Sequence, residues 1–268
     1  MNLILLIILF LVVGYSTGIL IGMLGIGGGI IFVPLLYFTL PYTGINSDHL
    51  TYIVIATSVF SSTIGTISSA REHFHSKNID INRALLLGAG SIVSAFFAPL
   101  IAINIPQHTL QIIFGIIFLF AAAKIIFETN NSFSILKNPL HNFFLILFGL
   151  GIGLLTGFAG IGGGILFVPA LAYLFLLDFK KAIGTSSMVT VLTTLTSTVS
   201  YSLMTPNGNS IPGQIGYVYL LAGIPLGLGS AFGAINGVKF VMNSSIPTVK
   251  KIFSVLLIVI ALKIIFDL

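Results

Sequence analysis

Two glycine-rich runs are the residues of this sequence best placed to do chemistry. The first, at 22–34, reads GMLGIGGGIIFVP, and the second, at 157–169, reads GFAGIGGGILFVP. Each Gly costs a helix about 1 kcal/mol relative to Ala, so three in a row favour an opened backbone. Helices that restart at Ile30 and Ile165 would turn free N–H groups and a positive dipole end toward the same space. The runs therefore predict two breaks that attract anions.

A matched pair of hydroxyl residues follows each run, Thr57-Ser58 after Ala56 and Thr185-Ser186 after Gly184. Near the start of an apolar stretch such hydroxyls either cap a helix or donate to an oxyanion. The many other Ser and Thr of 50–70 and 182–204 are expected to bond across helices or to their own carbonyls. The predicted substrate-binding residues are Gly25, Gly27, Gly28, Gly29, Thr57, Ser58, Gly160, Gly162, Gly163, Gly164, Thr185 and Ser186.

The glycines have two other interpretations. Small residues also let membrane helices pack closely, but that needs one small residue per turn and neither three in a row nor a Pro five residues later. A dinucleotide-binding fingerprint needs a soluble strand–helix unit with an acidic residue about 20 positions on, and neither run has one. The packing interpretation stays open, and the dinucleotide one is excluded.

The elements that must position these residues lie in lipid. The chain has 268 residues, of which 56% are hydrophobic and 6% charged, with a mean hydropathy of +1.14. Soluble domains carry about 25% charged residues. The pI of 9.5 does not indicate nucleic-acid binding, because the basic residues form no stripe. The apolar runs are 3–24, 30–40, 50–70, 84–104, 108–127, 140–159, 165–177, 182–204, 216–237 and 247–266.

These runs form two sets of five, which indicates an internal duplication. The glycine run recurs 135 positions later, and the two hydroxyl pairs correspond as well. The predicted boundaries are repeat 1 at about 1–127, a polar linker at about 128–139 and repeat 2 at about 140–268. The eleven residues of 30–40 reach about 16 Å as a helix, half of a 30 Å hydrocarbon core.

Basic residues indicate that the repeats are inverted. Loop 71–83 carries three, whereas the corresponding loop 205–215 carries none, and the bias reverses in the other loops. Because short cytoplasmic loops are enriched in Lys and Arg, corresponding loops are expected on opposite sides of the membrane. One topology puts all basic residues but Lys263 inside and both termini outside. The residues placed inside are Arg71, Lys77, Arg83, Lys124, Lys137, Lys180, Lys181, Lys239, Lys250 and Lys251.

Inverted repeats with broken helices are typical of secondary transporters, whose substrate binds near the membrane midplane. The predicted fold class is therefore an all-α polytopic membrane protein, with two inverted-topology repeats whose Gly-broken helical hairpins meet near that midplane. No ionisable residue lies near the middle of any run, so a charged substrate would meet backbone amides, hydroxyls and helix ends.

Other functional classes find little support. There is no Cys, no paired carboxylates and no Ser–His–Asp set within the apolar runs, so the chain is not expected to be an enzyme. The His-containing run 71–75 is interpreted as a solvated loop and not as a metal site. We expect no catalytic residue, no metal and no cofactor. The partners expected are a small anion and the lipid bilayer, with the coupling ion and the oligomeric state left open.

The duplicated pattern Gly-x-x-Gly-Ile-Gly-Gly-Gly-x-x-x-Val-Pro, with a Thr-Ser after each copy, resembles the TSUP family of TauE/SafE sulfite exporters over essentially the whole chain. The resemblance implies transport of sulfite, sulfonates or related organic anions across the bacterial inner membrane. A chain without Cys cannot use the chemistry of the thiosulfate carriers that have membrane cysteines.

The sequence thus predicts a transporter of small sulfur-containing oxyanions that works by alternating access at the interface of the repeats. An anion channel of the same architecture is the alternative, and saturable flux with counterflow would separate the two. A non-transporting membrane scaffold is a third possibility. A scaffold would have a tightly packed midplane without a polar cavity.

Overall fold

The structure is a computed structural model. It describes residues 3–43, 45, 50–102, 140–160, 162–205, 211–249, 251, 252 and 255. The expected apolar run 108–127, the linker 128–139 and most of the run 247–266 lie outside the described residues. Each half is therefore described through its first four runs.

The described chain is almost entirely helical. The first half contains α1 (Leu3–Leu24), α2 (Gly29–Thr39) with a 3-10 turn η1 (Leu40–Thr43), α3 (Leu50–His75) and α4 (Ile81–Ala102). The second half contains α6 (Phe143–Ala159), α7 (Gly164–Pro169) continued by a π-helix η2 (Ala170–Leu174), α8 (Phe179–Leu203) and α9 (Leu220–Asn243). Two-residue strands, β1 (Gln214–Ile215) and β2 (Val218–Tyr219), pair just before α9 and were not predicted.

Four described helices are long and apolar enough to cross a membrane, namely α1, α3, α4 and α9. The helices α2, α6 and α7 with η2 are apolar but shorter. This agrees with the predicted all-α membrane protein and with the prediction that the second run of each half is too short for a full crossing.

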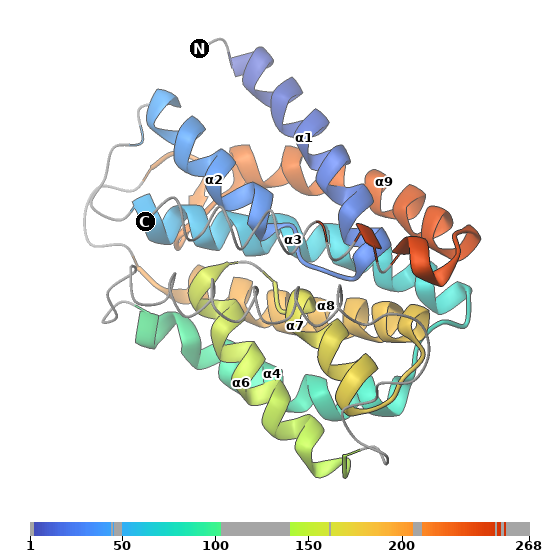
Figure 1. The fold of residues 1–268 in the computed structure, drawn as a ribbon. Helices are drawn as coiled ribbons and strands as arrows, with labels where there is room; N and C mark the ends of the chain where they lie inside the picture. The colour runs from blue at the N-terminus through green and yellow to red at the C-terminus, as the bar shows by residue number, and fades with distance from the viewer. Residues whose placement is uncertain are drawn as a thin grey trace.

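Helices of one half pack against helices of the other half in a regular pattern. The first helix of each half packs along the fourth helix of the other, so α1 lies beside α9 and α6 beside α4 (Figure 1). Between these two pairs lie α3 and α8, which pack against each other. As a result, most contacts of the fold join one half to the other.

Glycines hold α1 and α9 in backbone contact. They recur every fourth residue on both helices, so they form one face of each. They are Gly14, Gly18, Gly22, Gly229, Gly233 and Gly237. A Cβ at any of them would collide with a carbonyl oxygen of the opposite helix. Small residues at this spacing let helices in lipid approach closely enough for dispersion to stabilise them.

The pair α6 and α4 repeats this contact at the equivalent positions. A Cβ at Gly149 would collide with the Leu87 carbonyl oxygen of α4, and one at Gly153 with the Ser94 hydroxyl and the Ser91 carbonyl oxygen. A Cβ at Gly157 would collide with the Ala98 side chain. The first-helix glycines of the two halves are again 135 positions apart. The packing interpretation of glycine is therefore correct for this set, which sequence analysis did not single out.

The central helices α3 and α8 run antiparallel and are joined by hydroxyl groups. The Oγ1 atoms of Thr63 and Thr198 lie 3.3 Å apart, and the Oγ atoms of Ser69 and Ser187 lie 3.0 Å apart. Most other hydroxyls on these helices donate to the carbonyl four residues earlier, as Thr66 does to Ser62. The expected fate of these hydroxyls is confirmed.

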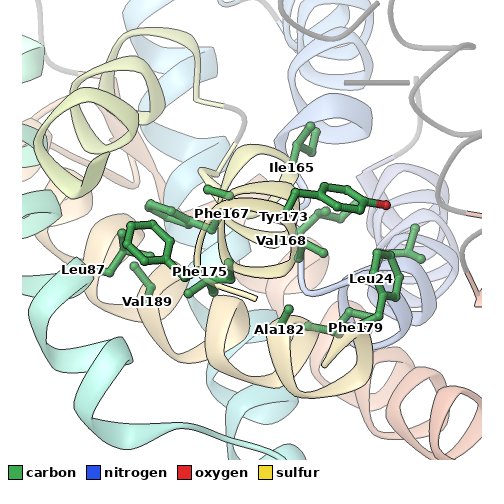
Figure 2. Close-up of a cluster of buried hydrophobic side chains, with 14 of the residues drawn as sticks. Leu24, Leu87, Ile165, Phe167, Val168, Tyr173, Phe175, Phe179, Ala182 and Val189 are labelled. Atoms are coloured by element: carbon green, nitrogen blue, oxygen red, sulfur yellow. The ribbon is translucent and has the colours of Figure 1, made fainter. Parts of the chain in front are cut away.

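Each short helix has its own apolar surroundings. Side chains of α7 and η2 pack among residues of α4, α8 and the end of α1, where Leu24 lies beside Phe179 and Ala182 (Figure 2). The buried side chains of α2 pack instead against the start of α3 and the start of α9. The short helix after each glycine run is thus held by a separate apolar cluster.

Candidate functional site: two glycine turns in contact

The first glycine run breaks the helix as predicted. Helix α1 ends at Leu24, and Gly25 takes a left-handed φ of 65° while its N–H donates to the Ile21 carbonyl. A left-handed residue at this place ends a helix, and glycine adopts it without strain. Helix α2 restarts at Gly29, one residue before the expected position, with Gly28 as its N-cap.

The second run makes an equivalent turn. Helix α6 ends at Ala159, and Gly160 and Gly162 have φ values of 66° and 75°. The chain re-enters helix α7 at Gly164, again one residue before the expected position. In both turns an aromatic ring covers the N-cap glycine: a Cβ on Gly28 or Gly163 would collide with the ring four residues later.

The two turns contact each other through their backbones. A Cβ on Gly162 would meet the Cα of Gly27, and a Cβ on Gly164 would collide with the Gly25 carbonyl oxygen. All eight predicted glycines are buried. The runs thus lie together at the centre of the contact between the halves, and glycine is required there because no side chain fits between them.

The two predicted serines each hold the turn of the opposite half. Ser58 on α3 donates to the Gly160 carbonyl at 3.1 Å, and Ser186 on α8 donates to the Gly25 carbonyl at 2.9 Å. Both side chains are fully buried. The carbonyl at each left-handed glycine, which the broken helix leaves unpaired, therefore receives a donor from the other half.

The two predicted threonines are reciprocal as well, but they face away from the turns. Thr57 accepts the N–H of Tyr219 at 3.0 Å, just before α9. Thr185 accepts the N–H of Asp80 at 2.9 Å, just before α4. Each threonine thus ties the third helix of its half to the start of the fourth helix of the other half.

Three further contacts at the turns were not predicted from the sequence. The Gly28 N–H donates to Ser62 of α3 at 3.0 Å, whereas Ser62 was expected to be one of the ordinary hydroxyls. The carbonyls of Gly22 and Gly157, one turn before each break, accept from His73 at 3.1 Å and from Tyr201 at 2.9 Å. The 128-residue spacing that joins the Thr-Ser pairs also joins His73 to Tyr201 and was the available signal.

The prediction of a solvated loop beginning at residue 71 is wrong. Helix α3 continues to His75, and His73 is fully buried. Its Nδ1 lies 3.3 Å from the Asn78 amide nitrogen, which also donates to the Lys180 carbonyl at 2.6 Å. The helix runs past its apolar stretch because His73 finds polar partners on α1 and in the turn before α4.

The polar groups around the turns are uncharged. Among the described residues no charged side chain is buried, and no three His, Cys, Asp or Glu side chains lie close enough to hold a metal ion. The described part of the site therefore offers amides, carbonyls and hydroxyls. Such groups suit an oxyanion, because N–H and O–H donors can replace its water without proton exchange.

The apolar helices and the two matched breaks that contact each other are consistent with a membrane protein of the transporter class. The family model for the sulfite exporters TauE/SafE matches residues 10–264, and the chain belongs to that family, which consists of transporters and not of enzymes.

Several curated proteins are similar to this chain. One from Methanocaldococcus jannaschii is 32% identical over 86% of this chain and 85% of its own length. Another from Haemophilus influenzae is 29% identical over 96% and 97%, and the YunE protein of Bacillus subtilis is 27% identical over 97% of each chain. All three are named probable membrane transporter proteins. No solved structure matches the chain.

Proposed function

We propose that this protein transports small sulfur-containing oxyanions, such as sulfite or a sulfonate, by alternating access between two inverted repeats. Repeat 1 covers about 1–127, a linker about 128–139, and repeat 2 about 140–268. Membership of the sulfite exporter family supports the substrate class.

The reciprocal contacts support the inverted arrangement. Equivalent helices α3 and α8 run antiparallel, and α1 and α9 run parallel, because Gly14, Gly18 and Gly22 meet successive turns of α9 in the same order. A pseudo-two-fold axis in the membrane plane relates helices in this way.

The single observation that carries the proposal is the meeting of the two glycine turns, each held by a serine of the opposite half. We assign substrate binding to the N–H groups of the turns. Ser58 and Ser186 hold the turns in place and become available to the anion when the turns separate. Thr57 and Thr185 fix the third helix of each half against the other half, behind the turns. The proposed binding residues are Gly25, Gly27, Gly28, Gly29, Thr57, Ser58, Gly160, Gly162, Gly163, Gly164, Thr185 and Ser186.

Alternating access requires the turns to part. In the structure they touch and are buried. Within the proposed cycle we interpret this arrangement as an occluded state. Opening toward one side would break a contact such as Ser58 to Gly160 and expose the anion to that side. Opening toward the other side would break its counterpart, Ser186 to Gly25.

The test is transport by the purified protein in proteoliposomes. Uptake of ³⁵S-labelled sulfite should saturate with concentration, and unlabelled sulfite inside should accelerate it by counterflow. A panel of sulfonates defines the substrate, while pH gradient, Na⁺ gradient and voltage are set independently to define coupling. Flux that does not saturate and shows no counterflow would identify a channel, and absence of flux for every sulfur oxyanion would exclude the function.

We further propose that the protein lies in a bacterial inner membrane with both termini outside and the turn 76–80 between α3 and α4 in the cytoplasm. The basic residues Arg71, Lys77 and Arg83 around this turn support that orientation. A C-terminal alkaline phosphatase fusion should be active and a C-terminal green fluorescent protein dark. The reverse pattern would contradict the orientation.

A further inference from the structure

A buried hydroxyl on α8, one helical turn beyond Ser186, has no hydrogen-bond partner in the described structure. Thr190 on α8 is fully buried, and its Oγ1 makes no hydrogen bond in the described structure. It does not donate a hydrogen bond to the carbonyl four residues earlier, as the Thr194 hydroxyl does. It also makes no hydrogen bond to a neighbouring helix, as the Thr193 hydroxyl does to Ser91. Buried polar side chains are nearly always paired, so this hydroxyl is unusual within a helix whose other hydroxyls are paired.

The repeat identifies what surrounds it. Three pairs of residues separated by 128 positions make equivalent contacts in the two halves: Thr57 with Thr185, Ser58 with Ser186, and His73 with Tyr201. At the same separation, Thr190 is the counterpart of Ser62.

Ser62 shows which contact this position makes in the first half. Its Oγ accepts the N–H of Gly28 in the first turn. The counterpart of Gly28 is Gly163 in the second turn, and Thr190 accepts no bond from it. In the first half, the hydroxyl at this position thus forms a hydrogen bond with the backbone N–H of the glycine turn. In the second half, the hydroxyl at the equivalent position has no partner.

We propose that Thr190 is a substrate-binding residue, whose hydroxyl donates a hydrogen bond to an oxygen of the transported anion. The assignment rests on the proposed function and deepens it, since it places the anion against the second glycine turn. An uncharged donor suits this place, because no buried charged side chain is described near the turns. The anion would supply the acceptor that the protein itself does not.

The experiment compares Thr190→Val with the wild-type full-length protein in detergent and in proteoliposomes. Valine keeps the volume of threonine and removes the hydroxyl. Titration calorimetry with sulfite and with methanesulfonate should show a Kd raised about tenfold, as expected for one lost hydrogen bond to an anion. Thr190→Ser keeps a donor and should restore the affinity to within about twofold.

Thermal unfolding separates this role from a structural one. Without substrate, Thr190→Val should unfold at the wild-type temperature or higher, because the hydroxyl it removes has no partner. The matched control is Thr194→Val, one turn further along α8, which is equally buried and whose hydroxyl is bonded to its own helix. Its Kd should equal that of the wild type.

Each other outcome is decisive. Unchanged Kd in Thr190→Val, with a wild type that binds, overturns the assignment and leaves the proposed function intact. Unchanged Kd with a reduced maximal flux means that Thr190 pairs with the second turn in another state, which also overturns it. If the wild type binds none of the sulfur oxyanions tested, both the proposed function and this assignment fail.

Discussion

The two glycine runs have nearly the same sequence, but the helices that follow them have different structures. Helix α2 runs as α-helix for 11 residues through Pro34, whereas α7 lasts six residues and continues from Pro169 as a π-helix. The turn before α2 is held by Ser62, and the turn before α7 has no equivalent bond from Thr190. The difference begins after the proline, where the two sequences diverge, with LLYFT at 35–39 and ALAYL at 170–174, and where the surrounding side chains differ as well.

Such a difference fits the proposed mechanism. A state that is open to one side requires the two halves to take different conformations, because inverted halves with the same conformation would treat both sides alike. The π-helix is informative in this respect, since single turns of π-helix often mark functional positions. The second hairpin is thus the part of the molecule where we expect substrate to cause change.

The third helices end differently too. Both supply a donor to the carbonyl one turn before the helix break, but the first half uses His73 and the second half uses Tyr201. His73 is further joined through Asn78 to the start of α8, while the backbone N–H of Tyr217 donates to the Tyr201 carbonyl at 3.1 Å. The two halves therefore have equivalent backbone contacts, but different side chains, His73 and Tyr201, make the contact at the end of the third helix.

The largest effect is expected where the halves are most alike, in the glycine contacts. Gly18→Leu in α1 and Gly153→Leu in α6 each place a side chain against the backbone of the partner helix. Overpacking of this kind costs about 3 kcal/mol or more, and the backbone cannot move aside without separating the helices. Both variants should lose folded protein to the same extent, measured by size-exclusion chromatography and thermal unfolding in detergent.

Helix α6 provides the control for that comparison. A Cβ at Gly151 meets no atom within 4 Å and the residue is exposed, so Gly151→Leu should fold as the wild type does. If Gly153→Leu were tolerated while Gly18→Leu was not, the two helix pairs would not be equivalent contacts.

A smaller loss of stability, similar in the two halves, is expected when either serine that donates to the other half is replaced. Ser58→Ala leaves the Gly160 carbonyl without its donor, and Ser186→Ala does the same to Gly25. An unpaired buried carbonyl costs about 1–3 kcal/mol, so each variant should unfold at a lower temperature.

Ser202→Ala is the control for the serines, because the Ser202 hydroxyl bonds only to the carbonyl of Thr198 in its own helix. It should change the unfolding temperature little. A large difference between Ser58→Ala and Ser186→Ala would show that one turn depends on its serine more than the other, and would extend the asymmetry of the hairpins to these contacts.

Much of this fold follows from the length of its apolar runs. The run 3–24 coincides with α1, and the breaks fall in the two glycine runs, because an apolar stretch and a triple glycine determine local structure by themselves. The ends of α3 and α9 were harder to predict. These helices continue beyond the apolar runs, to His75 and Asn243. At the end of α3 the buried His73 has polar partners in Gly22 and Asn78, and at the end of α9 the Met242 carbonyl accepts from Lys180 of α8.

The sequence predicts which residues form the candidate site, but it predicts only part of the contacts that they make. The repeat identifies Ser58 and Ser186 as equivalent, but it does not say that each reaches the turn of the other half. That depends on how the halves pack. The spacing of Gly14, Gly18 and Gly22, one glycine per helical turn, is typical of close helix packing in membranes and was the available signal for the contact with α9.

The smallest effect concerns the starts of the two fourth helices. Asp80, directly before α4, accepts the N–H of Arg83 at 3.1 Å and lies 3.6 Å from its Nε, with both side chains 25% exposed. Tyr219, directly before α9, makes no such side-chain bond. Asp80→Ala should therefore cost about 1 kcal/mol, the usual loss of a helix cap, and no substitution of the Tyr219 side chain should have this effect on α9.

Asp80→Asn separates the cap from the charge. Asparagine keeps an oxygen that accepts from Arg83 and loses only a partly exposed ion pair, which contributes at most about 0.5 kcal/mol. Both variants keep the backbone N–H that donates to Thr185, so the contact shared by the two halves remains. Thermal unfolding should place Asp80→Asn close to the wild type and Asp80→Ala below both. If Asn cost as much as Ala, the negative charge itself would stabilise this end of α4, and the difference between the starts of α4 and α9 would be electrostatic.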